Sequence, residues 1–112
     1  MASENNTKKH ILDSLDEILE QRMTTNPEQS YTAKLSNEGV DAILKKVSEE
    51  ATETVIASKC GDNAAIIHEI ADLWFHTIIL LKHHGLKADD ILEELHRRFG
   101  TSGIEEKANR KK

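Results

Sequence analysis

The chain has 112 residues, of which 20 are acidic and 15 are Lys or Arg, so its formal net charge is −5. This length is typical of one domain, and the negative charge argues against nonspecific binding to nucleic acid. Glycine is sparse, Pro27 is the only proline, and Leu, Ile, Ala, Glu and Lys dominate, which favours an all-α fold over a sheet.

Cys60 is the only cysteine and has no partner for an internal disulfide. The polar first ten residues lack the apolar segment of a signal peptide, and no apolar run has the length expected of a membrane span. We therefore expect a cytoplasmic protein with no membrane partner. We expect a single domain over residues 1–112, with flexible ends at residues 1–8 and 108–112.

An apolar stripe at helical spacing predicts a first helix ending near Arg22, with its inner face formed by Ile11, Leu12, Leu15, Ile18 and Leu19. Polar residues and Pro27 then predict a long loop over residues 23–36. Loops of that length within compact domains are usually functional or mobile. This one carries Lys34 among several hydroxyl side chains.

Two long helices are predicted next, over residues 37–59 and 62–84. Gly61 suits the end of the first, and Asp62 suits the N-cap of the second. The second is the most apolar segment, so we expect it at the centre of the fold. A last helix over residues 88–99 is expected to turn Ile91, Leu92 and Leu95 inward and to end at Gly100.

Acidic residues recur at helical spacing within these two long helices. Glu50 and Glu53 lie 11 and 8 residues before Gly61, and Asp72 and Glu69 lie 11 and 8 residues after it. If the helices form an antiparallel hairpin, the two pairs face each other at one height, because residues three or four apart share a helix face. Four carboxylates would then converge.

Carboxylates in apolar helices are costly to desolvate, and a divalent cation is the usual remedy. Oxygen donors without histidine or thiolate suit a hard ion, Mg²⁺ or Mn²⁺, rather than zinc. A ferritin-like di-iron site would need Glu-x-x-His, which is missing at Glu50 and Glu69. A zinc-protease motif starting at His68 would need histidine where Asp72 stands.

The order Glu49-Glu50-x-x-Glu53 followed by Glu69-x-x-Asp72 resembles the MazG-like all-α nucleoside-triphosphate pyrophosphohydrolases, in which carboxylates on two helices bind Mg²⁺. Residues 30–35, 43–47 and 97–107 are in addition similar to the phosphoribosyl-ATP pyrophosphatase family of histidine biosynthesis. The resemblance runs from about residue 11 to residue 110. It implies hydrolysis of phosphoribosyl-ATP to phosphoribosyl-AMP and pyrophosphate, with Mg²⁺ as the cofactor and Mn²⁺ as a plausible substitute.

Roles can be assigned to the residues of such a site. The expected metal ligands are Glu50, Glu53, Glu69 and Asp72. Glu49 is expected to bind a second ion or to take a proton from the attacking water, so the catalytic set is Glu49, Glu50 and Glu53. The residues expected to contact substrate are Lys34, Lys45, Lys46, Arg97, Thr101, Ser102 and Lys107.

Other readings of the pattern remain open. The acids could form a solvated helix face of a non-enzymatic interaction module, or serve a housecleaning pyrophosphatase that acts on ordinary or damaged nucleotides. The helix over residues 62–84 offers more apolar surface than one small chain can cover. We therefore expect a four-to-five-helix bundle that is completed by homodimerisation.

Overall fold

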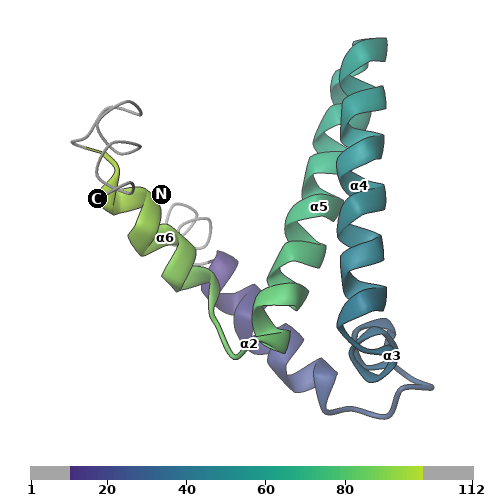
Figure 1. The fold of residues 1–112 in the computed structure, drawn as a ribbon, viewed down its shortest axis with the longest axis vertical. Helices are drawn as coiled ribbons and strands as arrows, with labels where there is room; N and C mark the ends of the chain where they lie inside the picture. Colours follow the sequence, from purple (N-terminus) through teal and green to yellow (C-terminus); the bar gives the residue numbers. More distant parts are fainter. Residues whose placement is uncertain (1–10, 100–112) are drawn as a thin grey trace, which may run out of the picture.

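The computed structural model describes residues 11–99, which form five helices and, within that range, no strand. Two long helices form an antiparallel hairpin, and the shorter helices gather around its open end (Figure 1). The helices are α2 (Ile11–Met23), α3 (Tyr31–Glu38), α4 (Val40–Cys60), α5 (Asn63–His83) and α6 (Ala88–Arg97). The predicted all-α class is confirmed. The two ends expected to be flexible, residues 1–8 and 108–112, lie outside the described residues.

The turn between α4 and α5 lies where the sequence predicts it. Gly61 has the left-handed conformation, with φ 76° and ψ 15°, and its N–H donates to the carbonyl oxygens of Ala57 and Ser58. Asp62 caps α5, because its Oδ1 accepts from the amides of Ala64 at 3.0 Å and Ala65 at 3.4 Å. The hairpin geometry thus follows from two adjacent residues whose conformations suit a helix end and a helix start.

The predicted loop over residues 23–36 is wrong in its second half. Ser30 ends the loop as the N-cap of α3, and its Oγ accepts from the amide of Ala33 at 3.2 Å. Burial of Thr32, Ala33 and Leu35 stabilises this helix despite its polar sequence. Gly39, with φ 100°, separates α3 from α4. The long helix therefore begins at Val40 rather than at residue 37.

The core lies where α2, α3, α4 and α5 meet, and its buried cluster is Leu19, Leu35, Ile43, Ile78 and Ile79. The α5 helix packs against α4, α2 and α3, which confirms its central position. By length and composition α5 could also cross a membrane, contrary to the expectation from the sequence. That is weak evidence for a span, since the central helix of a helical bundle passes the same test.

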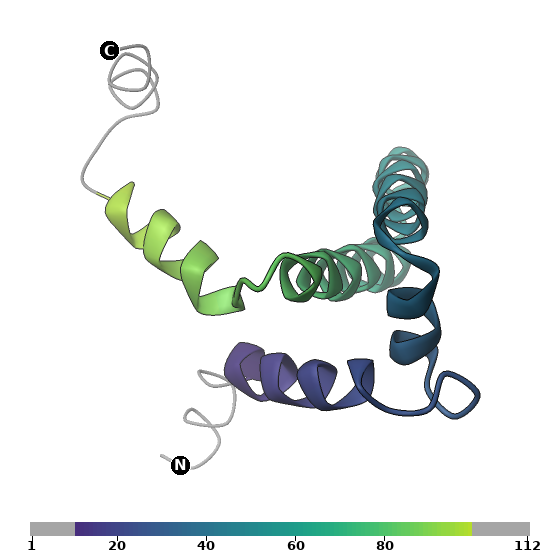
Figure 2. The same ribbon diagram turned by 60° about the horizontal axis from the view of Figure 1, so that its bottom comes forward.

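A buried ion pair and two hydrogen bonds join α2 to the end of α5 and the start of α6. Asp16 on α2 lies 3.0 Å from Nζ of Lys82 on α5, and both side chains are almost fully buried. The two carboxylate oxygens of Asp16 also accept from the amide of Ala88, the first residue of α6, at 3.1 and 2.9 Å. Figure 2 shows α2 beneath the end of α5 and the start of α6. A distant carboxylate therefore caps α6, because Lys87 before it offers no acceptor oxygen.

The apolar face of α6 is not buried within the described residues. Ile91, Leu92 and Leu95 are 46%, 39% and 45% exposed, so the prediction that they point into the core is wrong for a single chain. Together with Trp74, which is 58% exposed, they line an open apolar cavity of about 260 Å³. The α6 helix packs mainly on α2, and its apolar side remains available to another surface.

Candidate metal centre

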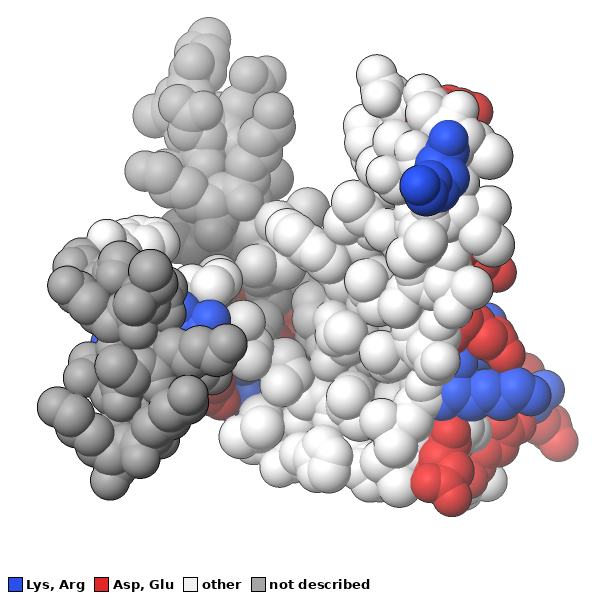
Figure 3. Space-filling view, turned by 45° about the horizontal axis from the view of Figure 1, so that its top comes forward, with Lys and Arg blue, Asp and Glu red and all other residues white. Residues whose placement is uncertain are grey.

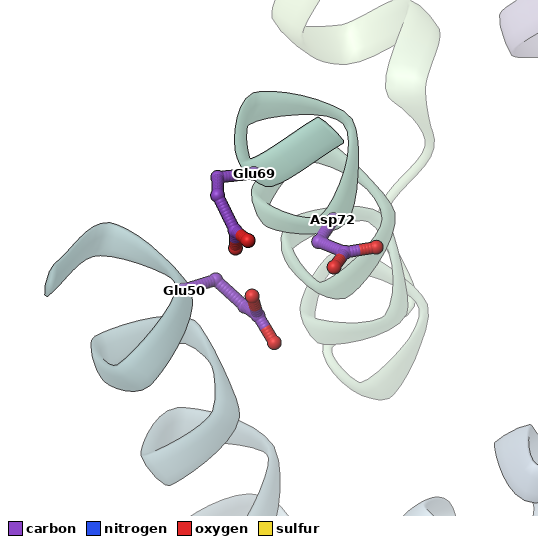
Figure 4. Close-up of side chains that lie close together, drawn as sticks. All are labelled: Glu50, Glu69 and Asp72. Carbon is purple, nitrogen blue, oxygen red and sulfur yellow. The ribbon is translucent and has the colours of Figure 1, made fainter. Parts of the chain in front are cut away.

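Three of the four predicted ligands converge between α4 and α5. One oxygen from each of Glu50, Glu69 and Asp72 lies within 4.8 Å of the others. Figure 4 shows Glu50 reaching from α4 toward Glu69 and Asp72 on α5. The Glu50 side chain comes from the helix that precedes Gly61 and the other two from the helix that follows it, so the hairpin itself brings the oxygens together.

Two oxygens of this cluster are buried without a hydrogen-bond donor. Oε2 of Glu50 and Oε2 of Glu69 have no partner among residues 11–99, and Glu50 as a whole is only 5% exposed. Leaving a buried acceptor unsatisfied costs about 1–3 kcal/mol, and more for a charged group. A cation bound between the helices would remove that cost. Because all the donors are oxygens, the set fits a hard ion such as Mg²⁺ or Mn²⁺.

Glu53, the fourth predicted ligand, is exposed but lies beside Glu69. A hydrogen bond with Glu53 is the main reason why the pKa of Glu69 is raised above its ordinary value of 4.5, and burial and the charge of Glu53 add to the effect. Glu53 and Glu69 therefore lie close enough across the hairpin for each carboxyl to affect the other. His68, when protonated, lowers the pKa of Glu69, and its Nε2 lies 3.4 Å from Oδ2 of Asp72.

Of the predicted phosphate-binding lysines, Lys46 lies at this cluster. Its Nζ is 3.5 Å from Oε2 of Glu49 and 3.7 Å from Oε1 of Glu50. Burial lowers the pKa of Lys46, but the neighbouring Tyr31 and the two glutamates outweigh it, so the net shift is upward. Lys46 thus stays protonated beside the carboxylates. Lys45 and Lys34 are exposed, on α4 and on α3 respectively, so Lys34 is on a helix rather than in a loop.

A tyrosine and a histidine that the sequence analysis did not assign also border the cluster. The hydroxyl of Tyr31 lies 2.8 Å from Nε2 of His76, and Nδ1 of His76 lies 2.9 Å from the carbonyl oxygen of Asp72. Since a carbonyl only accepts, Nδ1 carries the hydrogen and Nε2 accepts from the tyrosine. Burial is the main cause of the raised pKa of Tyr31. The contact spans 45 residues, so no local spacing predicts it.

Arg97, the one predicted substrate residue near the C-terminus that the structure describes, is separated from the carboxylates within one chain. Arg97 lies on α6, where its Nη2 is 2.6 Å from Oε1 of Glu94. Hydrogen bonds from Arg97, then from Arg98, lower the pKa of Glu94 to about 2. Figures 1 and 2 show α6 beside α2, away from the middle of the α4–α5 hairpin. Thr101, Ser102 and Lys107 lie outside the described residues.

Comparison with known proteins gives one consistent answer. The family model for phosphoribosyl-ATP pyrophosphohydrolase matches residues 12–99. A phosphoribosyl-ATP pyrophosphatase of Methylococcus capsulatus is 59% identical over 101 residues, which cover 90% of this chain and 96% of that protein. The proteins of the same name from Hydrogenovibrio crunogenus and Chromobacterium violaceum are 58% and 52% identical, each over at least 90% of this chain and 94% of the relative. The chain therefore belongs to the phosphoribosyl-ATP pyrophosphohydrolase family, whose members are hydrolases.

Proposed function

We propose that this protein hydrolyses phosphoribosyl-ATP to phosphoribosyl-AMP and pyrophosphate in histidine biosynthesis, with Mg²⁺ as its cofactor and Mn²⁺ as a substitute. Family membership supports the reaction. The observation that carries the metal is the convergence of Glu50, Glu69 and Asp72, two of whose oxygens are buried without a hydrogen-bond donor. If the acidic residues only formed a solvated helix face, those oxygens would be exposed to water.

In this proposal Glu50, Glu53, Glu69 and Asp72 hold the ion. Bound there, Mg²⁺ would neutralise negative charge on the phosphate oxygens of the substrate. Glu49 lies beside the cluster and takes the proton of the attacking water. Lys46 already contacts Glu49 and Glu50 and supplies a positive charge to the departing pyrophosphate. Lys34 and Lys45 are candidates for the outer phosphates.

A side-by-side assay tests the substrate. Purified protein with Mg²⁺ should release pyrophosphate from phosphoribosyl-ATP much faster than from any deoxynucleoside triphosphate, and excess EDTA should stop the release. Equal or faster hydrolysis of deoxynucleoside triphosphates would instead assign a housecleaning enzyme. No release from either substrate, together with no thermal stabilisation by Mg²⁺ or Mn²⁺, would leave the non-enzymatic interaction module.

A second copy of the chain is the proposed partner for the exposed apolar surface. Figure 3 shows a face on which uncharged residues form a broad central area, while charged side chains lie mainly at the right-hand edge, with a few on the left. Ile67 and Trp74 on α5 are 69% and 58% exposed, and the apolar side of α6 is uncovered. Trp74 and the apolar residues of α6 line one cavity, and an exposed apolar patch of this kind usually marks an interface. We further propose a cytoplasmic location, with no membrane or nucleic-acid partner.

Replacement of Ile91 by glutamate should convert the proposed dimer to a monomer, because it places a charge in the apolar cavity shared with Trp74. Analytical ultracentrifugation at several concentrations measures the change in mass. The matched control is Glu93→Gln, an exposed position on the same helix, which should leave the mass unchanged. A wild-type protein that sediments as a monomer at all concentrations would refute the proposed dimer.

A further inference from the structure

A second, more polar cavity lies beside the carboxylate cluster and has no role in the mechanism above. It has a volume of about 420 Å³ and opens between the end of α2, the start of α3 and the middle of α5. The cavity is lined by Arg22, Thr25, Gln29, Ser30, Tyr31, Thr32 and Phe75. The lining combines one cation, several hydroxyls and two aromatic rings, unlike the apolar cavity next to Trp74.

Local hydrogen bonds hold the rim of this cavity in shape. The hydroxyls of Thr24 and Thr25 donate to the carbonyl oxygen of Gln21 at 2.9 and 3.0 Å. The amide of Gln29 donates to the carbonyl oxygen of Asn26 at 2.9 Å. The segment between α2 and α3 is therefore ordered by its own backbone and side chains, and the cavity is already formed before any ligand binds, as is usual for ligand sites.

Several polar groups of the lining remain available to a ligand. Thr32 is only 2% exposed, and its hydroxyl has no hydrogen-bond partner within residues 11–99. Ser30 satisfies the amide of Ala33, so the amides of Tyr31 and Thr32 are the open donors in the first turn of α3. Arg22 lines the same cavity as this helix N-terminus, and the two together favour an anionic group. The Thr32 hydroxyl is not among the fully buried atoms without a partner in the described residues, so it reaches the open cavity, where it can form a hydrogen bond with a ligand.

Two residues of the cavity lining lie close to the proposed metal site. Phe75, in its lining, follows Asp72 by three residues and so lies next to it on α5. Tyr31, also in the lining, contacts His76, which in turn contacts the carbonyl oxygen of Asp72. The charges of Lys46 and Glu50 act on the Tyr31 hydroxyl as well. The cavity and the proposed metal site are therefore neighbours, related through Tyr31, His76 and Asp72.

We propose that this cavity binds the phosphorylated ribosyl group of the substrate. This inference rests on the proposed function, in which the substrate carries a triphosphate at one end and a ribose phosphate at the other. The triphosphate lies at the carboxylates and Lys46. The sugar phosphate lies in the cavity, where Arg22 pairs with its phosphate and Thr32 hydrogen-bonds to it or to the sugar hydroxyls. The cavity thereby distinguishes phosphoribosyl-ATP from ATP, which lacks this group.

The kinetic test compares two arginine variants. Arg22→Ala should raise KM for phosphoribosyl-ATP by about tenfold or more, because it removes hydrogen bonds to a charged group, and should change kcat little. The thermal shift produced by Mg²⁺ alone should stay as in wild type. Arg98→Ala is the matched control, since that side chain pairs with Glu94 on α6, far from the cavity. Equal KM values in the two variants would overturn the inference.

A binding test separates this inference from the proposed function. Ribose 5-phosphate, added to ¹⁵N-labelled protein, should shift the amide signals of Gln29, Tyr31 and Thr32 in the wild type and in Arg98→Ala but not in Arg22→Ala. Ribose without phosphate should give much smaller shifts. Thr32→Val, which removes only the hydroxyl, should weaken binding in the same direction. Absence of these shifts in wild type overturns the inference even if phosphoribosyl-ATP is hydrolysed. If the shifts appear but no phosphoribosyl-ATP is hydrolysed, the proposed function fails while the sugar-phosphate site stands.

Discussion

Glu50→Gln is expected to lower the rate of pyrophosphate release by about a thousandfold or more, because a metal ion contributes several kcal/mol of transition-state stabilisation and each 1.36 kcal/mol is tenfold in rate. Glu50 is the most buried of the converging carboxylates and the only one contributed by α4 to the three-residue cluster. Glutamine keeps the size and shape of the side chain but removes its charge. The loss therefore reports on the charge rather than on packing.

When no metal is added, the same substitution should raise the stability of the protein, although it lowers the activity. Oε2 of Glu50 and Oε2 of Glu69 are both buried without donors, and an amide at position 50 can donate to the glutamate across the hairpin. We expect the free energy of unfolding to rise by about 1 kcal/mol, the net value of one hydrogen bond. Wild type should gain about 2.7 kcal/mol at a Mg²⁺ concentration of 100 Kd, and the variant should gain almost nothing.

Denaturant unfolding with and without Mg²⁺ measures both effects, and the pyrophosphate assay measures the first. Glu17→Gln, at an exposed position on α2, is the control for loss of one negative charge. Full activity in Glu50→Gln would remove this residue from the metal site. Reduced activity with an unchanged Mg²⁺ response would show that Glu50 matters for another reason.

The sequence predicts the parts of the fold that depend on neighbouring residues. Gly61 and Asp62 have conformational preferences of their own, so they place the α4–α5 turn without any help from the rest of the chain. Once that turn is fixed, helical spacing determines that Glu50 faces Asp72. The convergence of acidic residues is therefore readable from the sequence, because it needs only one local turn and two regular helices.

The parts that depend on distant contacts are not readable in this way. Thr32 looks like a loop residue in the sequence but is buried by packing of α3, and Tyr31 finds His76 45 residues away. The apolar face of α6 has the helical pattern of a core segment, yet nothing in the described chain covers it. A hydrophobic pattern predicts that a face is buried, but not whether the covering surface belongs to the same molecule.

Asp16→Ala is expected to destabilise the fold by about 3–5 kcal/mol, which is the usual cost of removing one partner of a buried ion pair. The variant leaves Lys82 as a buried charge, since the Lys82 side chain is only 6% exposed and its Nζ lies 3.0 Å from Asp16. It also removes the acceptor of the first amide of α6. No residue of the local sequence indicates this role, because Asp16 and Ala88 are 72 positions apart.

Urea unfolding, followed by circular dichroism, measures the loss, and Glu17→Ala is the control because its side chain is exposed on the same helix. The double variant Asp16→Leu/Lys82→Met should recover much of the stability, since an apolar pair of similar volume often replaces a buried ion pair without cost. It should not restore the cap, so α6 is expected to fray at Ala88 while the core remains folded. If Asp16→Ala and Glu17→Ala unfold at the same urea concentration, Asp16 does not hold α2, α5 and α6 together.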